Sequence, residues 1–263
     1  MSNGFYQKHS LGQHFLTDTR VLEQIIEVAD PRQEDAFLEI GPGAGVLTEA
    51  LAARCGKVLS VEIDRRLEPI LKLRLQNHTN VEILWTDFQR VKWAELQEKL
   101  GLRFRVAANI PYAITTPILD SLFRAQPSPL SAVLLMQKET AAKLLAREGQ
   151  KGYGPMAIKA ALLTRSTLIC QVPPDAFDPP PRVDSAVVNL DWKDTPKVNT
   201  RKLDTLLRVA FSARRKQIHN NLGALGWSRE EITVRLGEAD CLPTQRPEQI
   251  SPAAYAMISD YIS

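Results

Sequence analysis

A short apolar segment at 36–40 leads directly into the turn Gly-Pro-Gly-Ala-Gly at 41–45, and a segment with helical character follows at 46–53. Glycine adopts positive φ at little cost, so this turn lets the chain pass from a strand to a helix within a few residues. A strand, a glycine turn and a helix in this order are typical of α/β sheets, in which the turn brings a ligand close to the helix N-terminus. This turn therefore restricts the possible folds more than any other segment.

Apolar segments of strand length alternate with segments of helical periodicity as far as Trp192. This alternation is typical of a mostly parallel sheet with helices on both faces. The expected fold class is therefore α/β, with a Rossmann-like sheet. We predict strands at 36–40, 57–63, 81–85, 105–108, 132–136, 166–172 and 186–192, and helices around 21–28, 46–53, 67–75, 117–123 and 140–146.

The pattern changes in the last quarter of the chain. After Trp192 no strand pattern is found, and Leu203, Leu207 and Phe211 recur at helical spacing. We therefore predict an α/β domain at 1–195 and a small helical domain at 196–263.

The composition excludes several classes of protein. With 44% apolar and 24% charged residues, the chain has the material for a globular core and is not a disordered protein. No apolar run approaches the ~18 residues of a membrane span, and the first ten residues lack the apolar core of a secretory signal. The three cysteines lie far apart without metal-ligand spacing. We therefore expect a reduced, cytoplasmic protein without a bound metal.

The positive charge is concentrated in one segment. The net charge is only +3, but no acid occurs between Thr205 and Arg229. A positive surface of this kind can bind phosphate, although a merely solvated helix face gives the same pattern. We predict RNA contacts within this segment at Arg214, Arg215 and Lys216.

Acidic residues near the glycine turn indicate a nucleoside cofactor. Glu62 ends the strand after the turn, 21 residues beyond Gly41, where an acid binds ribose hydroxyls. The third glycine comes one position earlier than in dinucleotide sites, and Glu39 suits an ammonium group better than a pyrophosphate. These features favour S-adenosylmethionine over NAD. Asp87, after the third strand, could accept a hydrogen bond from the adenine amino group or could simply cap a helix.

The sequence Asn-Ile-Pro-Tyr at 109–112 follows the fourth predicted strand. An exocyclic amine on a π system is a poor nucleophile because its lone pair is delocalised. Hydrogen bonds accepted by the Asn109 side chain and the Ile110 carbonyl would draw the nitrogen toward tetrahedral geometry. Pro111 would fix the backbone, and Tyr112 would stack on the ring. The motif therefore predicts direct in-line methyl transfer to an amine, without a general base or a metal.

Seven segments, in order along nearly the whole chain, resemble the ribosomal RNA adenine dimethyltransferases, and most of all their bacterial housekeeping branch. The resemblance implies a Rossmann-like S-adenosylmethionine-dependent methyltransferase domain with a small all-helical C-terminal domain. It also implies dimethylation at N6 of two adjacent adenosines in the 3′-terminal hairpin loop of 16S rRNA, in a partly assembled 30S particle. We expect a monomer without a membrane partner. The segments are 10–16, 41–45, 61–64, 109–112, 135–139, 177–185 and 210–216.

The resemblance also implies roles for individual residues. Phe177 would sandwich the flipped adenine against Tyr112, although it could instead fill the junction between the domains. Many members have Asn where this chain has His14, so we expect an altered cofactor affinity, unless His14 is a plain surface residue. Lys8 and His9 could touch RNA. The predicted cofactor contacts are His14, Leu16, Gly41, Gly43, Glu62, Asp87 and Asn109.

Alternative functions remain open at this point. DNA adenine and protein glutamine amide methyltransferases usually carry two prolines in the motif where this chain has Pro111 alone. The glycine spacing disfavours an NAD-dependent oxidoreductase. An rRNA-binding assembly factor whose methyl transfer is secondary, and a methyltransferase of large-subunit rRNA, remain the competing hypotheses.

Overall fold

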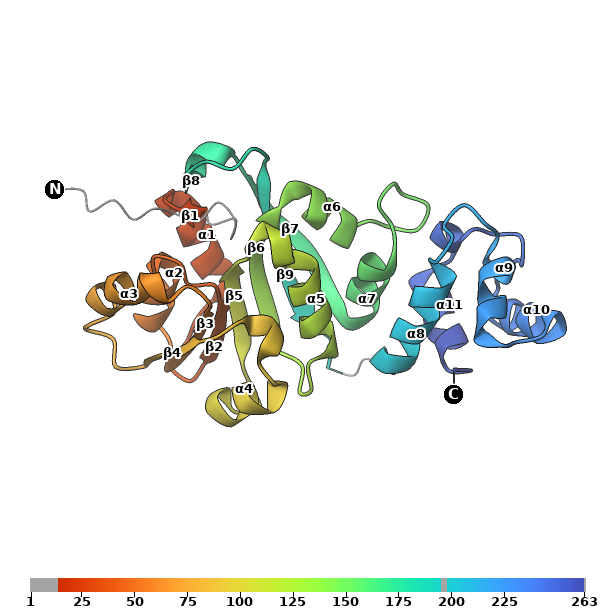
Figure 1. Ribbon diagram of the computed structural model, residues 1–263, viewed down its shortest axis with the longest axis horizontal. Helices are drawn as coiled ribbons and strands as arrows, with labels where there is room; N and C mark the ends of the chain where they lie inside the picture. Colours follow the sequence, from red (N-terminus) through yellow and green to blue (C-terminus); the bar gives the residue numbers. More distant parts are fainter. Residues whose placement is uncertain (1–13, 195–197, 263) are drawn as a thin grey trace. The chain divides into compact units, whose positions relative to one another are not determined.

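The computed structural model describes residues 14–194 and 198–262, and a seven-stranded sheet lies at the centre of its first part (Figure 1). The strand order is β4-β3-β2-β5-β6-β9-β7, and β1 and β8 form a separate two-stranded sheet. The strands are β1 (Phe15–Leu16), β2 (Ala36–Ile40), β3 (Lys57–Glu62), β4 (Val81–Trp85), β5 (Arg105–Asn109), β6 (Ser131–Gln137), β7 (Thr164–Val172), β8 (Phe177–Asp178) and β9 (Ser185–Trp192).

The sheet is mostly parallel, and its strand order reverses beside β2. Leu38 of β2 pairs in parallel with Leu59 of β3 on one side and with Val106 of β5 on the other. Strand β6 runs parallel to β5, whereas β9 is antiparallel to β6. In doubly wound sheets, ligands bind beyond the carboxyl ends of the strands at the point where the order reverses. A ligand-binding site is therefore expected beyond the carboxyl ends of β2 and β5.

The expected α/β class is confirmed, and all seven predicted strands are present. Strand β6 is buried along almost its whole length, as expected for a strand covered on both faces. The predicted helices are also present, whereas α4 and α7 were not predicted. The helices are α1 (Thr19–Ala29), α2 (Val46–Ala52), α3 (Glu68–Arg74), α4 (Trp93–Leu100), α5 (Thr115–Arg124), α6 (Lys138–Leu144), α7 (Pro155–Leu163), α8 (Thr200–Ala210), α9 (Ile218–Leu222), α10 (Arg229–Glu238) and α11 (Pro252–Ser259).

Contacts divide the chain into two compact units. The first combines residues up to 141 with 167–191, and the second combines 142–166 with the chain from 192 onward. Helix α7 belongs to the second unit because it shares an apolar core with α8 and α11, and the Tyr153 hydroxyl in this unit donates to the Ile250 carbonyl at 2.8 Å. The predicted boundary at 195 lies outside the described residues, and separate functions for 1–195 and 196–263 stay a prediction.

None of the helices in the described ranges has both the length and the apolar character that crossing a bilayer requires.

Candidate cofactor and target-base site

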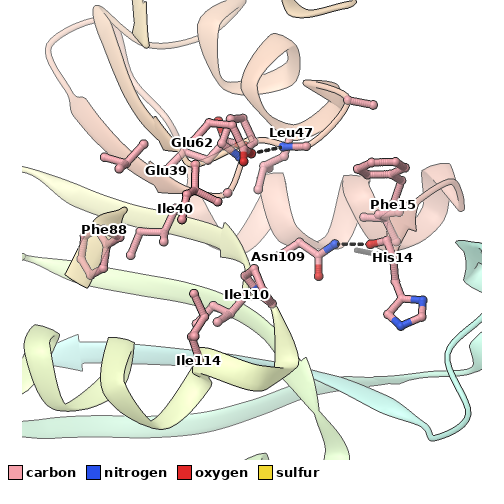
Figure 2. A pocket seen from close by; sticks show the side chains of 18 of the residues that line it. His14, Phe15, Glu39, Ile40, Leu47, Glu62, Phe88, Asn109, Ile110 and Ile114 are labelled. Atoms are coloured by element: carbon pink, nitrogen blue, oxygen red, sulfur yellow. Dashed lines mark hydrogen bonds between the residues drawn. The ribbon is translucent and has the colours of Figure 1, made fainter. Parts of the chain in front are cut away.

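A pocket lies at the carboxyl edge of the sheet, where four parallel strands end (Figure 2). The glycine turn follows β2, Glu62 ends β3, Asp87 follows β4 and Asn109 ends β5, and all four line this pocket. Carboxyl ends of parallel strands meet at one edge, so residues far apart in sequence converge there. The pocket thus brings together the groups that the sequence indicated for cofactor and target.

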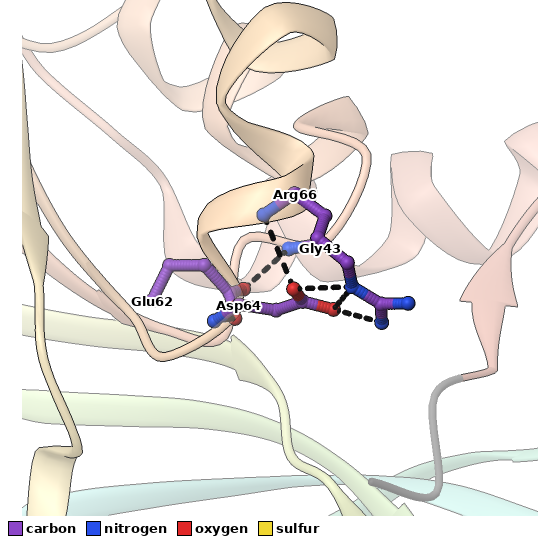
Figure 3. A network of polar contacts seen from close by, with 4 residues as sticks. All are labelled: Gly43, Glu62, Asp64 and Arg66. Atoms are coloured by element: carbon purple, nitrogen blue, oxygen red, sulfur yellow. Dashed lines mark hydrogen bonds and ion pairs between the residues drawn. The ribbon is translucent and has the colours of Figure 1, made fainter. Parts of the chain in front are cut away.

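The glycine turn requires glycine at its third position, Gly43. Gly43 has a φ of 56°, and a Cβ atom there would lie 2.9 Å from the aromatic ring of Phe15. The Gly43 N–H donates to Oε2 of Glu62 at 3.3 Å (Figure 3). The turn therefore packs closely against Phe15, and its backbone also holds the Glu62 side chain in place.

Glu62 is almost fully buried, at 5% exposed. Burial raises the pKa of its carboxyl group, and hydrogen bonds from backbone N–H groups oppose that rise, including one from Asp64 to Oε1 at 2.8 Å. A carboxylate has about four acceptor positions, so two oriented oxygens can still accept from vicinal hydroxyls. Asp64 in turn pairs with the guanidinium of Arg66, which fixes the chain after β3 (Figure 3).

Glu39 lies beneath the glycine turn and is 1% exposed. Its Oε2 accepts hydrogen bonds from the Thr48 hydroxyl at 2.6 Å and the Ser60 hydroxyl at 2.8 Å. Burial raises the pKa of Glu39 to about 7, while these two hydrogen bonds oppose the rise. Charge on Glu39 is therefore costly unless a cation approaches, which suits the predicted ammonium group.

Asp87 caps a helical turn and also lines the pocket, while its contact with adenine stays a prediction. Its Oδ1 accepts from the Gln89 N–H at 2.9 Å and so caps the short helical turn that follows β4. Asp87 also lines the pocket, next to the buried ring of Phe88. A cap and a binding residue are therefore compatible here, because a carboxylate that accepts one backbone hydrogen bond retains further acceptor positions.

Asn109 is oriented by a contact that spans the sequence. Its Nδ2 donates to the backbone carbonyl of His14 at 3.0 Å (Figure 2). A carbonyl oxygen can only accept a hydrogen bond, so the Asn109 atom that contacts it must be the amide nitrogen Nδ2. Among the residues that the structure describes, none donates a hydrogen bond to Oδ1 of Asn109. The Ile110 N–H donates to the Leu135 carbonyl at 2.9 Å, which anchors the motif to β6. The ring of Pro111 lies beside Gly41.

Tyr112 lies at the pocket wall next to Asn109. Its hydroxyl and that of Ser185 are 2.6 Å apart, and burial raises its pKa, so the phenol remains neutral. The ring of His14 stacks on Tyr112, with centroids 5.4 Å apart and planes inclined by 29°. Nδ1 of His14 lies 2.7 Å from the Pro179 carbonyl, which requires that this nitrogen carries the proton.

Phe177 is not among the residues that line the pocket. It is 3% exposed and packs in an apolar cluster with Leu16, Val172 and Ala176. Antiparallel pairing of β1 with β8 places Phe177 opposite Leu16, which does line the pocket. Contact between Phe177 and a target base stays a prediction, and it requires the ring to leave this cluster.

The three predicted RNA contacts lie together in the second unit. Arg214, Arg215 and Lys216 are all exposed, in the turns that follow α8. Arg214 also donates to the Tyr153 carbonyl at 2.6 Å, so part of its guanidinium has an internal partner. Lys8 and His9 lie outside the described residues.

Sequence reasoning missed the groups that support the site. Nothing in the local pattern distinguishes Thr48 and Ser60 as partners of Glu39, and the Pro179 carbonyl is a backbone group. Ser185 gave one usable signal, since it ends the segment 177–185 that carries the family resemblance.

Comparison with known sequences gives a consistent family. The sequence pattern described as "Ribosomal RNA adenine dimethylase" matches residues 4–261. A ribosomal RNA small subunit methyltransferase A from Latilactobacillus sakei subsp. sakei is 40% identical over 273 residues, covering 99% of this chain and 91% of that protein. A protein of the same name from Rippkaea orientalis is 37% identical and covers 95% of each chain.

Two crystal structures share this fold over nearly the whole chain. A dimethyladenosine transferase from Plasmodium falciparum has a TM-score of 0.81 at 28% identity, covering 93% of this chain and 96% of that one. The 23S rRNA methyltransferase ErmE has a TM-score of 0.72 at 27% identity, covering 94% and 99%. With the family pattern matched from residue 4 to residue 261, the chain belongs to the ribosomal RNA adenine dimethylase family.

Proposed function

We propose that this enzyme uses S-adenosylmethionine to dimethylate N6 of two adjacent adenosines in the 3′-terminal hairpin loop of 16S rRNA, within the 30S particle. Membership of the family makes the chain an rRNA adenine dimethyltransferase. The small-subunit substrate is supported by the names of relatives that are 35–40% identical over nearly the full length. Such a modification would contribute to small-subunit biogenesis.

The residues of the pocket fit S-adenosylmethionine. Glu62 offers oriented acceptors for the ribose hydroxyls, and Glu39 provides a buried carboxylate that a nearby ammonium group would stabilise. Gly43 lets the turn pack against Phe15 at the pocket wall, and Asp87 can accept from the adenine amine. When bound, the cofactor supplies an electrophilic methyl group on a sulfonium.

The orientation of Asn109 is the single observation that carries the proposal. Its Nδ2 is committed to the His14 carbonyl, so Oδ1 is left to accept from the exocyclic amine of the target. Accepting that hydrogen bond localises the nitrogen lone pair. Tyr112, three residues further on, provides a ring for stacking, which is worth about 1–3 kcal/mol per base.

No general base is required in this arrangement. The attacking amine becomes a cation when it is methylated, and its proton is then acidic enough to pass to water or to the accepting oxygens. The protein positions the amine and stabilises developing charge, and orientation of this kind can lower a barrier by about 7–11 kcal/mol. The adenine must leave its stack to reach the pocket, which costs least from a loop.

The other parts of the proposal concern RNA binding and location. The exposed Arg214, Arg215 and Lys216 would bind rRNA phosphates. Cys55 and Cys241 are buried free thiols, and burial raises the pKa of Cys55 to about 11, which is compatible with a reducing cytoplasm. We further propose that the enzyme acts as a monomer.

Methyl transfer from labelled S-adenosylmethionine to 30S subunits from cells that lack the modification tests the proposal. Nuclease digestion and mass spectrometry should identify dimethyladenosine at two adjacent positions, and an Asn109→Ala variant should give almost none. Transfer to 50S subunits alone would favour a large-subunit enzyme. Cofactor and RNA binding without any transfer would favour an assembly factor.

A further inference from the structure

The imidazole of His14 covers part of the pocket wall that the target base would need. His14 and Tyr112 both line the pocket, and their rings are stacked with centroids 5.4 Å apart. Stacked rings lie about 3.5–4 Å apart, so a purine between these two rings would require a separation of about 7–8 Å. The two rings are in direct contact, and no base fits between them in this arrangement.

Two contacts on opposite sides of the residue hold His14 in this position. Its Nδ1 donates to the Pro179 carbonyl at 2.7 Å, and its own carbonyl accepts from Nδ2 of Asn109 at 3.0 Å. Pairing of β1 with β8 joins the two segments concerned, with Phe15 opposite Asp178. The imidazole is therefore fixed by the fold and is not a side chain that lies on Tyr112 by chance.

Phe177, which the resemblance predicts as the second ring at the target base, packs in an apolar cluster. Phe177 is 3% exposed within the apolar cluster that includes Leu16 of β1, whereas His14 is the residue whose ring contacts Tyr112. The contact that orients Asn109 involves the backbone of His14 and not its ring. Rotation of the imidazole away from Tyr112 would therefore leave the orientation of Asn109 intact.

We propose that His14 is a placeholder for the target adenine: its imidazole occupies the stacking face of Tyr112 in the base-free enzyme, and the incoming adenine displaces it. This inference rests on the proposed function, in which the adenine stacks on Tyr112. His14 then weakens binding of the target base and raises the KM for rRNA. It is a specificity-determining residue because a ligand that stacks less well than adenine fails to displace it.

The test compares variants by steady-state kinetics on unmodified 30S subunits, with cofactor affinity measured separately by calorimetry. His14→Ala and His14→Gln both remove the ring, and Gln keeps a donor within reach of the Pro179 carbonyl. Both should lower the KM for 30S subunits about three- to tenfold at saturating S-adenosylmethionine, which is a larger change than either makes in the Kd for S-adenosylmethionine.

A matched control distinguishes the effect of the His14 ring from an effect on the contacts between the segment of β1 and the segment of β8. Thr17→Val removes another hydrogen bond between them, from the Thr17 hydroxyl to the Ala176 carbonyl at 3.1 Å, away from Tyr112. Its KM should equal that of the wild type. In a Tyr112→Ala background, His14→Ala should no longer change the KM.

An unchanged or raised KM in both His14 variants overturns the placeholder role, as does a lowered KM in Thr17→Val. If the proposed function itself is wrong, the wild-type enzyme transfers no methyl group to 30S subunits. This outcome differs from a wild-type enzyme that is active and His14 variants that do not lower the KM.

Discussion

The side chain of Asn109 donates a hydrogen bond to the backbone carbonyl of His14 at 3.0 Å, across 95 positions of sequence. One residue ends a central strand and the other precedes the two-residue strand β1. The contact orients the amide so that its oxygen is available at the pocket, next to the ring of Tyr112. The position of the His14 backbone therefore decides how Asn109 would bind the target amine.

Asn109→Ala should lower the rate of methyl transfer about 10²- to 10³-fold, because a preorganised hydrogen-bonding group at the reacting amine is lost. Single-turnover transfer to 30S subunits measures this rate. Asn80→Ala is the control, since Asn80 bonds the carbonyls of Ala52 and Cys55 away from the pocket and its loss should lower stability alone. Equal rates for wild type and Asn109→Ala would remove Asn109 from the chemistry.

Glu62→Ala should weaken cofactor binding about 10- to 100-fold, because two acceptors for ribose hydroxyls are lost at about 1 kcal/mol or more each. Isothermal calorimetry with S-adenosylmethionine measures the affinity. Glu82→Gln is the matched control, because Glu82 pairs with Lys99 in a partly exposed ion pair outside the pocket. If both variants bind as the wild type does, Glu62 has no ribose contact.

Glu39 should make the stability of the protein depend on pH. Its pKa is about 7 in the folded protein against 4.5 ordinarily, so the folded state holds the proton more tightly than the unfolded state. The stabilisation is therefore complete below pH 4.5 and is lost as pH rises through 7. At 1.36 kcal/mol per pKa unit, the loss is of the order of 3 kcal/mol.

Urea unfolding at intervals from pH 5 to 8 tests this prediction. The free energy of unfolding should fall with pH in the wild type, and Glu39→Gln should flatten that fall because glutamine does not titrate. The difference between the two proteins isolates Glu39 from the other groups that titrate in this range. Parallel curves for both proteins would show that Glu39 has an ordinary pKa.

Neutralising Arg215 and Lys216 to Gln should reduce the salt dependence of rRNA binding. Each phosphate contact contributes roughly 0.7–0.9 to the slope of log K against log salt, so the slope should fall by up to about 2. Filter binding at several salt concentrations measures it. Arg214 is left intact in this variant because it also donates to the Tyr153 carbonyl.

Arg32→Gln with Lys72→Gln is the control for net charge, because both residues form exposed ion pairs in the first unit. If this control lowers the slope as much as the variant does, the effect reflects net charge and not a local RNA contact.

Much of the fold follows from local patterns. Strands β2 to β6 are short apolar segments bounded by turns, and their boundaries differ from the predicted ones by one residue at most. Strands β1 and β8 were missed because two residues are too few for any periodicity. Helix α7 was missed because its sequence is apolar almost throughout, which hides the helical stripe that a half-exposed helix shows.

The sequence alone determined the parts of the site that depend on backbone conformation and strand position. A glycine turn after a strand, an acid at the end of the next strand and Asn-Ile-Pro-Tyr after a central strand must meet at one edge of a parallel sheet. Only the tertiary structure decided which side chains face one another there. His14 stacks on Tyr112 and Phe177 is buried because β1 pairs with β8, and no local pattern encodes a two-residue pairing between segments about 160 positions apart.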